Sequence, residues 1–164
     1  MTQVHYRRRL PFPPARLVGQ YFDLEHIAHV HPRSLGEARL VSTAGSRVVW
    51  DLLSPRFLGF RLRHRVLQEL VAPDRIEAEV LGGLLRGARV STDLVADGDG
   101  TLVVERYRVP LVPGWRWLAR WFEPWFHRWL DAVWEEDLRV HMCHGGWPGV
   151  PPKTQRWDGQ SLRT

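Results

Sequence analysis

The hydrophobic pattern of this chain changes its period along the sequence, and these changes limit the fold more than any other feature. Residues 4–10 alternate in polarity and end before the prolines of PFPP at 11–14, which predicts a first strand. Residues 15–29 carry apolar side chains at helical spacing, which predicts two short helices. The second helix should end near His31, because Pro32 disfavours the helical conformation in the residue before it.

From residue 35 to residue 110 the period is two, which predicts a run of short strands. The expected strands are 36–43, 46–54, 58–70, 74–81, 87–96 and 101–110. Turn-forming residues separate them, so consecutive antiparallel hairpins are expected. Helical spacing then returns, with a short helix at about 115–122 and a long one at about 124–142, which would have Pro124 in its first turn.

The chain has 164 residues, which suits one domain with a single core, expected here at residues 1–144. Residues 145–164 are rich in proline, glycine and polar side chains and are expected to form a C-terminal tail. Cys143 is the single cysteine, which excludes an internal disulfide and a cysteine-rich metal site. Residues 1–14 lack the apolar core of a signal peptide, and no apolar run has the length of a membrane helix, so we expect a cytoplasmic protein that is not integral to a membrane.

This order of elements resembles the helix-grip fold of the START/Bet v 1-like superfamily (SRPBCC), which includes the polyketide cyclase/dehydrase-like proteins. The resemblance covers about residues 3–143 and also rests on the pattern H-x-x-x-x-H-P at 26–32. It implies an α+β fold in which a curved antiparallel sheet wraps around a long C-terminal helix and leaves an apolar cavity. It also implies binding of an apolar or aromatic small molecule, such as a lipid, sterol or polyketide, and cyclase or dehydratase chemistry if the protein is an enzyme.

The inward faces of the predicted strands and helix supply candidate cavity residues. In strand 58–70, alternation places His64 on the apolar face, where an imidazole costs free energy unless it has a partner. His64 is therefore either a hydrogen-bonded core residue or a polar anchor for a ligand. The candidate ligand-binding residues are His64, Trp50, Tyr6, Phe60, Leu62, Trp129 and Val133. Each of the aromatic ones suits a packed core as well as a cavity wall.

The charge pattern bears on the choice of partner. The net charge is +5, and the outward face of strand 58–70 carries Arg61, Arg63 and Arg65. Glu77 and Glu79 on the next strand are expected to pair with these arginines. No nucleic-acid motif accompanies the basic residues, so a nucleic-acid partner is not expected. A homodimer stays open, as does an interaction module that exposes the tryptophan-rich region around 115–125.

The stretch FDLEHIAHVHP at 22–32 contains three histidines and suggests a metal site. Asp23, His26 and His31 have the spacing D-x-x-H-x-x-x-x-H, which resembles the iron-binding segment in the catalytic domain of Rieske-type ring-hydroxylating oxygenases, itself a helix-grip fold. The resemblance implies that His26, His31 and Asp137 bind the metal, with Glu136 as a substitute for Asp137. It also implies that Asp23 orients a ligating imidazole or relays electrons.

Two imidazoles and one carboxylate can occupy one face of an iron or zinc ion and leave positions open for substrate. Asp137 ends the apolar stripe of the long helix, where an acid needs a partner. The alternative is a metal-free pocket in which His26 or His31 is hydrogen-bonded to backbone or to an acid. With one cysteine, the chain lacks the ligands of a Rieske [2Fe–2S] cluster, so an oxygenase reaction would need a separate electron donor.

Overall fold

The computed structural model describes residues 1–23, 26, 30–31, 33–54, 61–110 and 119–144, and within the last range it describes only the backbone of 119–122 and 140–144. Seven strands form one antiparallel sheet in the order β1-β7-β6-β5-β4-β3-β2. The strands are β1 Thr2–Leu10, β2 Glu37–Ala44, β3 Arg47–Leu53, β4 Arg63–Ala72, β5 Arg75–Gly82, β6 Arg89–Asp97 and β7 Gly100–Val109. Consecutive hairpins build β2 to β7, as their turn residues predict, and β1 closes the sheet beside β7.

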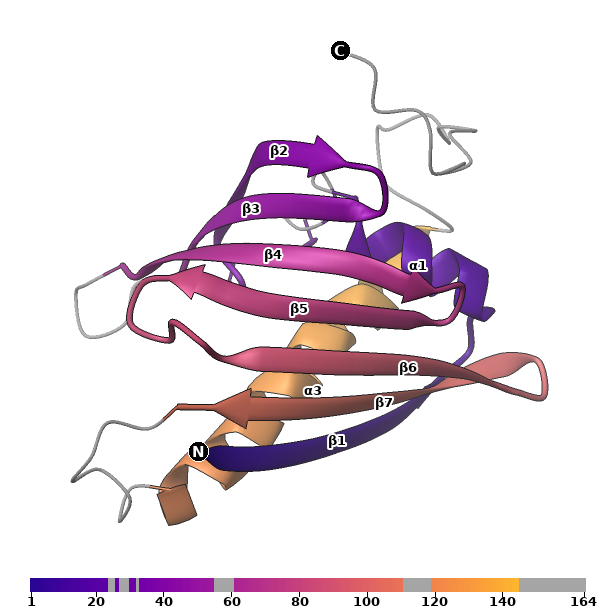
Figure 1. Ribbon diagram of the computed structural model, residues 1–164. Helices are drawn as coiled ribbons and strands as arrows, with labels where there is room; N and C mark the ends of the chain where they lie inside the picture. The colour runs from indigo at the N-terminus through magenta and orange to yellow at the C-terminus, as the bar shows by residue number, and fades with distance from the viewer. Residues whose placement is uncertain (24–25, 27–29, 32, 55–60, 111–118, 145–164) are drawn as a thin grey trace.

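Two helices lie on the same side of the sheet (Figure 1). Helix α1 spans Pro14–Tyr21, and helix α3 spans Ala119–His144 and crosses the sheet diagonally. The order of the described elements, expected from the periodicity, and the α+β helix-grip class, implied by the resemblance, are confirmed. The second short helix expected before His31 and the helix expected at 115–122 fall largely outside the described residues.

The prediction for Pro124 was wrong, because this proline lies inside α3 instead of in its first turn. Helix α3 begins at Ala119, so Pro124 removes one backbone hydrogen bond from the helix interior. The side chain of Trp125, next to it, is 46% exposed. The apolar stripe of α3 begins one residue later with Phe126, which packs against the core.

The core lies between the inner face of the sheet and the two helices. Its buried members are Tyr6, Leu10, Phe12, Leu17, Val18, Ile76, Leu94, Val103, Leu130 and Trp134. Alternation within β1 and β7 directs every second side chain into this layer. No described helix combines the length and the apolar character needed to cross a bilayer.

Strand β4 begins at Arg63, later than the predicted start at residue 58. Leu62 precedes the strand and is 36% exposed, so it does not belong to the buried core. Its backbone is held instead by Ser54, whose N–H donates to the Leu62 carbonyl oxygen at 2.8 Å. The segment 55–60, which includes the predicted cavity residue Phe60, lies outside the described residues.

Two of the outward arginines pair with acids on β2 and β3. Arg65 forms two hydrogen bonds to the Asp51 carboxylate, at 2.9 and 3.1 Å, and Arg61 lies 2.8 Å from Glu37. The predicted pairing with Glu77 and Glu79 was wrong, because the register places those acids opposite Glu69 and Leu67. Asp51, in contrast, lies directly opposite Arg65 in the pairing of β3 with β4.

Candidate metal centre

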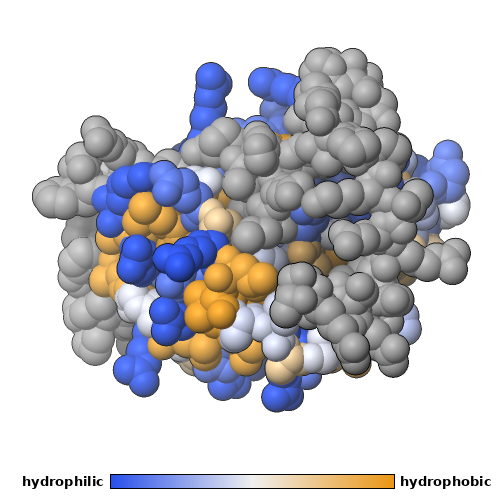
Figure 2. Space-filling view, turned by 90° about the horizontal axis from the view of Figure 1, so that it is seen from above, coloured by the Kyte–Doolittle hydropathy of each residue, from blue (hydrophilic) through white to orange (hydrophobic). Residues whose placement is uncertain are grey.

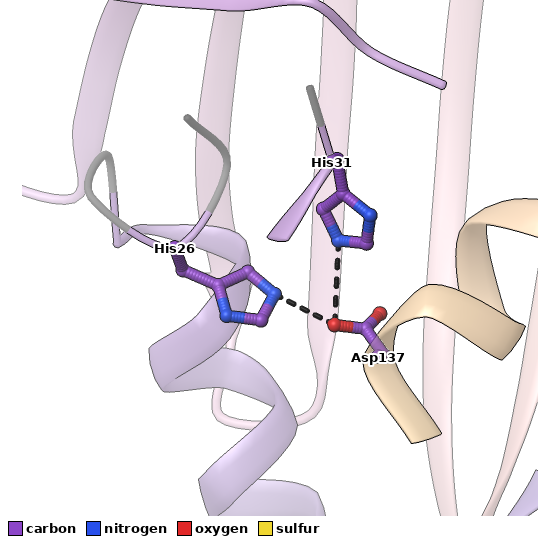
Figure 3. A group of neighbouring side chains, drawn as sticks. All are labelled: His26, His31 and Asp137. Atoms are coloured by element: carbon purple, nitrogen blue, oxygen red, sulfur yellow. Dashed lines mark ion pairs between the residues drawn. The ribbon is translucent and has the colours of Figure 1, made fainter. Parts of the chain in front are cut away.

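His26, His31 and Asp137 converge beside the C-terminal half of α3 (Figure 3). The Nε2 atom of His26 lies 2.7 Å from Asp137 Oδ1, and the Nε2 atom of His31 lies 3.3 Å from the same oxygen. One ligand atom from each residue lies within 4.8 Å of the other two. All three residues are buried, with 3%, 3% and 4% of their surface exposed, respectively.

Short-range contacts hold the two histidines in place. The Asp23 carboxylate accepts a hydrogen bond from the backbone N–H of His26 at 3.2 Å, so Asp23 positions the backbone that carries this imidazole. The carbonyl oxygen of His31 accepts from the N–H groups of Leu35 and Gly36, at 2.9 and 3.0 Å. This turn ends the histidine segment, and Gly36 permits it with a φ of 83°.

Glu136 binds the other nitrogen of His31, so it acts on a ligand residue and does not replace Asp137. His31 Nδ1 lies 3.1 Å from Glu136 Oε2, and the Ser34 hydroxyl donates to the same oxygen at 2.6 Å. The indole N–H of Trp129 in turn donates to the Ser34 carbonyl oxygen at 2.9 Å. A carboxylate on Nδ1 selects the tautomer in which Nε2 carries the lone pair that a metal requires.

The charges of this cluster favour an anionic carboxylate. Burial alone would lower the pKa of the His31 imidazole, but hydrogen bonds to Asp137 and Glu136 and their charges outweigh it and raise that pKa. Burial would raise the pKa of Asp137, yet the imidazoles of His26 and His31 bring it below its ordinary value. The carboxylate therefore stays ionised at neutral pH, as a metal ligand must be.

The donor set fits a divalent transition metal. Two neutral imidazole nitrogens and one carboxylate oxygen suit iron or zinc. Metal–ligand bonds of roughly 2.0–2.2 Å place adjacent donor atoms about 3 Å apart. The distances from Asp137 Oδ1 to the two Nε2 atoms, 2.7 and 3.3 Å, lie on either side of that value. Both Nε2 atoms approach the same oxygen of Asp137, although positions five apart on a straight helix would diverge by about 140°.

The predicted cavity residues occupy different environments. Tyr6 is buried, and its hydroxyl donates to Asp131 on α3 at 2.7 Å. Trp50 is buried on the inner face of β3, while Trp129 and Val133 are half-buried on α3. Tyr6 and Trp129 thus bind other parts of the protein with their polar atoms, as core residues do.

His64 is half-buried on the inner side of β4, as its position in the alternation predicts. Its Nδ1 atom is buried and has no hydrogen-bond partner in the part of the chain that the structure describes. Burial lowers the pKa of this imidazole, so it is neutral at neutral pH. Gly83 makes room for it, since a Cβ there would lie 2.8 Å from Nδ1 and would also clash with the Arg63 carbonyl oxygen.

Two hollows among the described residues lie away from this interior. One of about 530 Å³ lies on the outer face of the sheet among charged residues such as Arg75, Glu77 and Arg106. The other, of about 280 Å³, lies at the turn between β6 and β7 near Arg9 and Asp99. The space between sheet and α3 is occupied by aromatic side chains over its described part.

Exposed apolar side chains are scattered over the described surface. The large ones are Met1, Leu40, Val41, Leu62, Val71, Leu81, Leu84, Val95 and Trp125. Figure 2 shows apolar and charged groups interspersed on the face seen there. Trp115 and Trp117 of the predicted interaction patch lie outside the described residues, and for Trp121 only the backbone is described.

Glu105 is a buried acid that the sequence reasoning missed. It lies on the inner face of β7, is 4% exposed, and accepts hydrogen bonds from the hydroxyls of Tyr21 and Tyr107. The available signal was the alternation of strand 101–110, which places Glu105 on the same face as Val103 and Tyr107. An acid on the apolar face of a central strand is itself informative, because burying it is costly.

The curved antiparallel sheet and the C-terminal helix define a Bet v 1-like helix-grip fold. The fold is similar to that of TTHA0849 from Thermus thermophilus, with a TM-score of 0.69 and 20% identity over 87% of this chain and 99% of that one. It is also similar to the di-domain ARO/CYC StfQ from the steffimycin biosynthetic pathway, with a TM-score of 0.64 and 14% identity over 84% of this chain and 48% of that one.

Ara h 8.0201 has the same fold, with a TM-score of 0.56 and 13% identity over 82% of this chain and 98% of that one. No protein-family model and no curated protein matches the sequence. At these identities the structural likeness shows the fold alone. The names of the three proteins lend no support to a Rieske-type oxygenase.

Proposed function

We propose that this protein binds iron or zinc at His26, His31 and Asp137 and presents that ion to an apolar or aromatic small molecule. The observation that carries the proposal is the convergence of three buried ligand atoms within 4.8 Å. They come from two segments more than a hundred residues apart in the sequence. The spacing shared with the iron-binding segment of Rieske-type oxygenases places iron among the candidates.

The surrounding residues have distinct roles in this proposal. Glu136 holds His31 in the tautomer that directs Nε2 toward Asp137, and Ser34 and Trp129 hold Glu136 from the other side. Asp23 fixes the backbone of His26. A bound ion would supply Lewis acidity toward an oxygen atom of the small molecule. The three protein ligands leave coordination positions for that oxygen.

Metal analysis tests this proposal. Protein prepared without an affinity tag and supplied with iron or zinc should retain about one ion per chain, and His26→Ala or His31→Ala should abolish retention, since each removes one of three protein ligands. His5→Ala is the matched control, because His5 is exposed on the outer face of β1 and should leave the metal content unchanged. Inductively coupled plasma mass spectrometry measures the metal content of each protein. Full retention by His31→Ala would contradict the proposed site.

A second candidate is a metal-free binding protein for an apolar or aromatic small molecule. The observation that favours it is the half-buried His64, whose Nδ1 has no partner among the described residues and is available to a ligand. The helix-grip fold, shared with a protein named as a di-domain ARO/CYC from the steffimycin biosynthetic pathway, is consistent with a small-molecule ligand.

Extraction of the purified protein with organic solvent, followed by mass spectrometry, tests the second candidate. We expect a co-purified apolar compound that persists in His31→Ala, since the metal site is not required for binding under this candidate. His64→Ala should reduce the amount recovered, because it removes the polar anchor. His127→Ala is the control and should leave the recovered amount unchanged. His127 is a half-buried histidine on α3 that packs against Tyr6. Loss of the compound in His31→Ala would favour the metal-centred proposal instead.

A further inference from the structure

The two ends of the antiparallel sheet differ in the side chains that they expose. The β5–β6 end holds the turn at residues 83–88, the starts of β1, β4 and β6 and the ends of β3, β5 and β7 (Figure 1). The opposite end holds the turns that join β2 to β3, β4 to β5 and β6 to β7. Helix α3 begins near the β5–β6 end, because Phe126 packs against Tyr107, two residues before the end of β7.

Large exposed apolar side chains gather at the β5–β6 end. Of the nine in the described chain, five lie there, namely Met1, Leu62, Leu81, Leu84 and Trp125. They come from separate segments of the chain. Leu84 lies within the turn and is 68% exposed, so most of its side chain meets solvent. Transfer of these side chains from water into an apolar phase would be favourable.

Arginines lie among these apolar side chains. Arg63, Arg86 and Arg108 belong to the β5–β6 end and form no ion pair within the described chain. Glu37 and Glu79, at the same end, each pair with another arginine, at 2.8 and 3.2 Å. These two acids are therefore already neutralised, and the three arginines keep their positive charge.

The sequence of the β5–β6 end has the same bias. Residues 54–68, 80–92 and 106–122 contain ten arginines and no aspartate or glutamate. Glu123, which follows the last range, is the one acid near this end that is exposed and unpaired in the described chain. The turns at the opposite end carry Asp74, Asp97 and Asp99. The sheet thus has a basic end and an acidic end.

The turn that carries Leu84 satisfies part of its own backbone. The Arg86 N–H donates to the Gly83 carbonyl oxygen at 3.2 Å, and the Ala88 N–H donates to the Leu85 carbonyl oxygen at 2.9 Å. Gly83 permits this tight path with a φ of 90°. Backbone groups that are bonded within the turn lose no hydrogen bond when water is displaced. The tip of the turn can therefore enter a less polar medium at low cost.

We propose that the β5–β6 end docks onto the surface of an anionic lipid bilayer. Leu84 enters the boundary between headgroups and acyl chains, and Arg63 and Arg86 face the lipid phosphates. Apolar side chains among unpaired basic residues match this boundary, where negative phosphates lie above hydrocarbon. Docking of this kind is a surface contact and uses none of the residues of the candidate metal centre.

Vesicle sedimentation tests the docking in the full chain. Vesicles of phosphatidylcholine and phosphatidylglycerol should bind the protein about a hundredfold more tightly than vesicles of phosphatidylcholine alone, because each of three basic residues near an anionic surface contributes about 1 kcal/mol. Binding to the anionic vesicles should weaken as sodium chloride is added, since dissolved ions screen exposed charges. Equal binding to the two kinds of vesicle, or none to the anionic kind, would overturn the proposal.

Paired variants separate the β5–β6 end from the rest of the surface. Leu84→Glu should weaken binding to anionic vesicles at least tenfold, by an order-of-magnitude estimate, since it replaces an inserted apolar group with an anion. Val71→Glu is its control, because Val71 is also exposed and lies near the opposite end. Arg86→Gln should weaken binding about fivefold, as expected for one basic residue. Arg47→Gln removes the same charge at the opposite end and should leave binding nearly unchanged.

The remaining outcomes are equally decisive. Full binding by Leu84→Glu would overturn insertion of the turn, and equal losses in Arg86→Gln and Arg47→Gln would assign binding to net charge alone and overturn the docking surface. Thermal unfolding confirms that each variant is folded, and Arg86→Gln tests the surface even if Leu84→Glu is not. Binding of an acidic protein at this end, with no binding to vesicles, would also overturn the proposal. His31→Ala should bind vesicles normally, so the metal proposal is tested separately.

Discussion

Replacing Asp137 with alanine should lower the free energy of unfolding of the metal-free protein by about 3–5 kcal/mol at neutral pH. The carboxylate is the shared partner of two buried imidazoles, at 2.7 Å from His26 and 3.3 Å from His31. Its removal leaves both imidazoles buried without that partner. The methyl group of alanine cannot replace the hydrogen bonds that the carboxylate formed with them. Urea denaturation of chelator-treated protein measures the change.

Glu135→Ala is the matched control for Asp137→Ala. Glu135 lies on the same helix and is exposed, and its carboxylate lies 3.9 Å from Arg139. Exposed ion pairs of this kind contribute little, so the change should stay within about 0.5 kcal/mol. Equal effects of the two substitutions would mean that the buried cluster contributes no special stability, and would weaken the case that Asp137 holds the histidines together.

Trp134→Ala should also destabilise the protein by about 3–5 kcal/mol, because it removes the largest side chain of the core cluster. Trp134 is 6% exposed and packs edge-on against Tyr21, with ring centroids 6.1 Å apart. The cavity left behind would lie between α1, α3 and the sheet, and rigid strands can close it only in part. Guanidinium denaturation, followed by near-ultraviolet circular dichroism, measures both stability and the loss of aromatic packing.

Trp125→Ala provides the comparison on the same helix. Trp125 is 46% exposed, so its truncation removes less buried surface, and a loss of about 1 kcal/mol or less is expected. A small effect of Trp134→Ala would instead indicate that the interior is loosely packed and adapts to ligands. That result would strengthen the small-molecule part of the proposed function.

Periodicity predicted the order of the strands and of the long helix because it reflects local backbone geometry. Side chains alternate between two faces along a strand and return to the same face about every 3.6 residues along a helix. Each type of element therefore leaves its own period in the spacing of apolar residues. Element ends were less well predicted, since they depend on partners. Strand β4 begins at Arg63 because the pairing with β3 reaches no further, with Leu53 opposite Arg63.

The resemblance in FDLEHIAHVHP and the position of Asp137 on the helix predicted the three residues that converge in the structure. The sequence left open whether Asp137 or Glu136 would join the histidines. Neighbouring residues on a helix point about 100° apart, so the rotation of α3 against the sheet decides between them. Packing of Leu130 and Trp134 into the core sets that rotation and directs Asp137 to both Nε2 atoms.

The sequence by itself therefore determined the elements, their order and the residue types available for a metal site. Only the tertiary structure decided that β1 closes the sheet beside β7, and this pairing places Tyr6 beside Glu105. It also brought Tyr21, from α1, over a strand more than eighty residues away in the chain. Contacts between distant segments depend on the simultaneous packing of all layers, which no local pattern encodes.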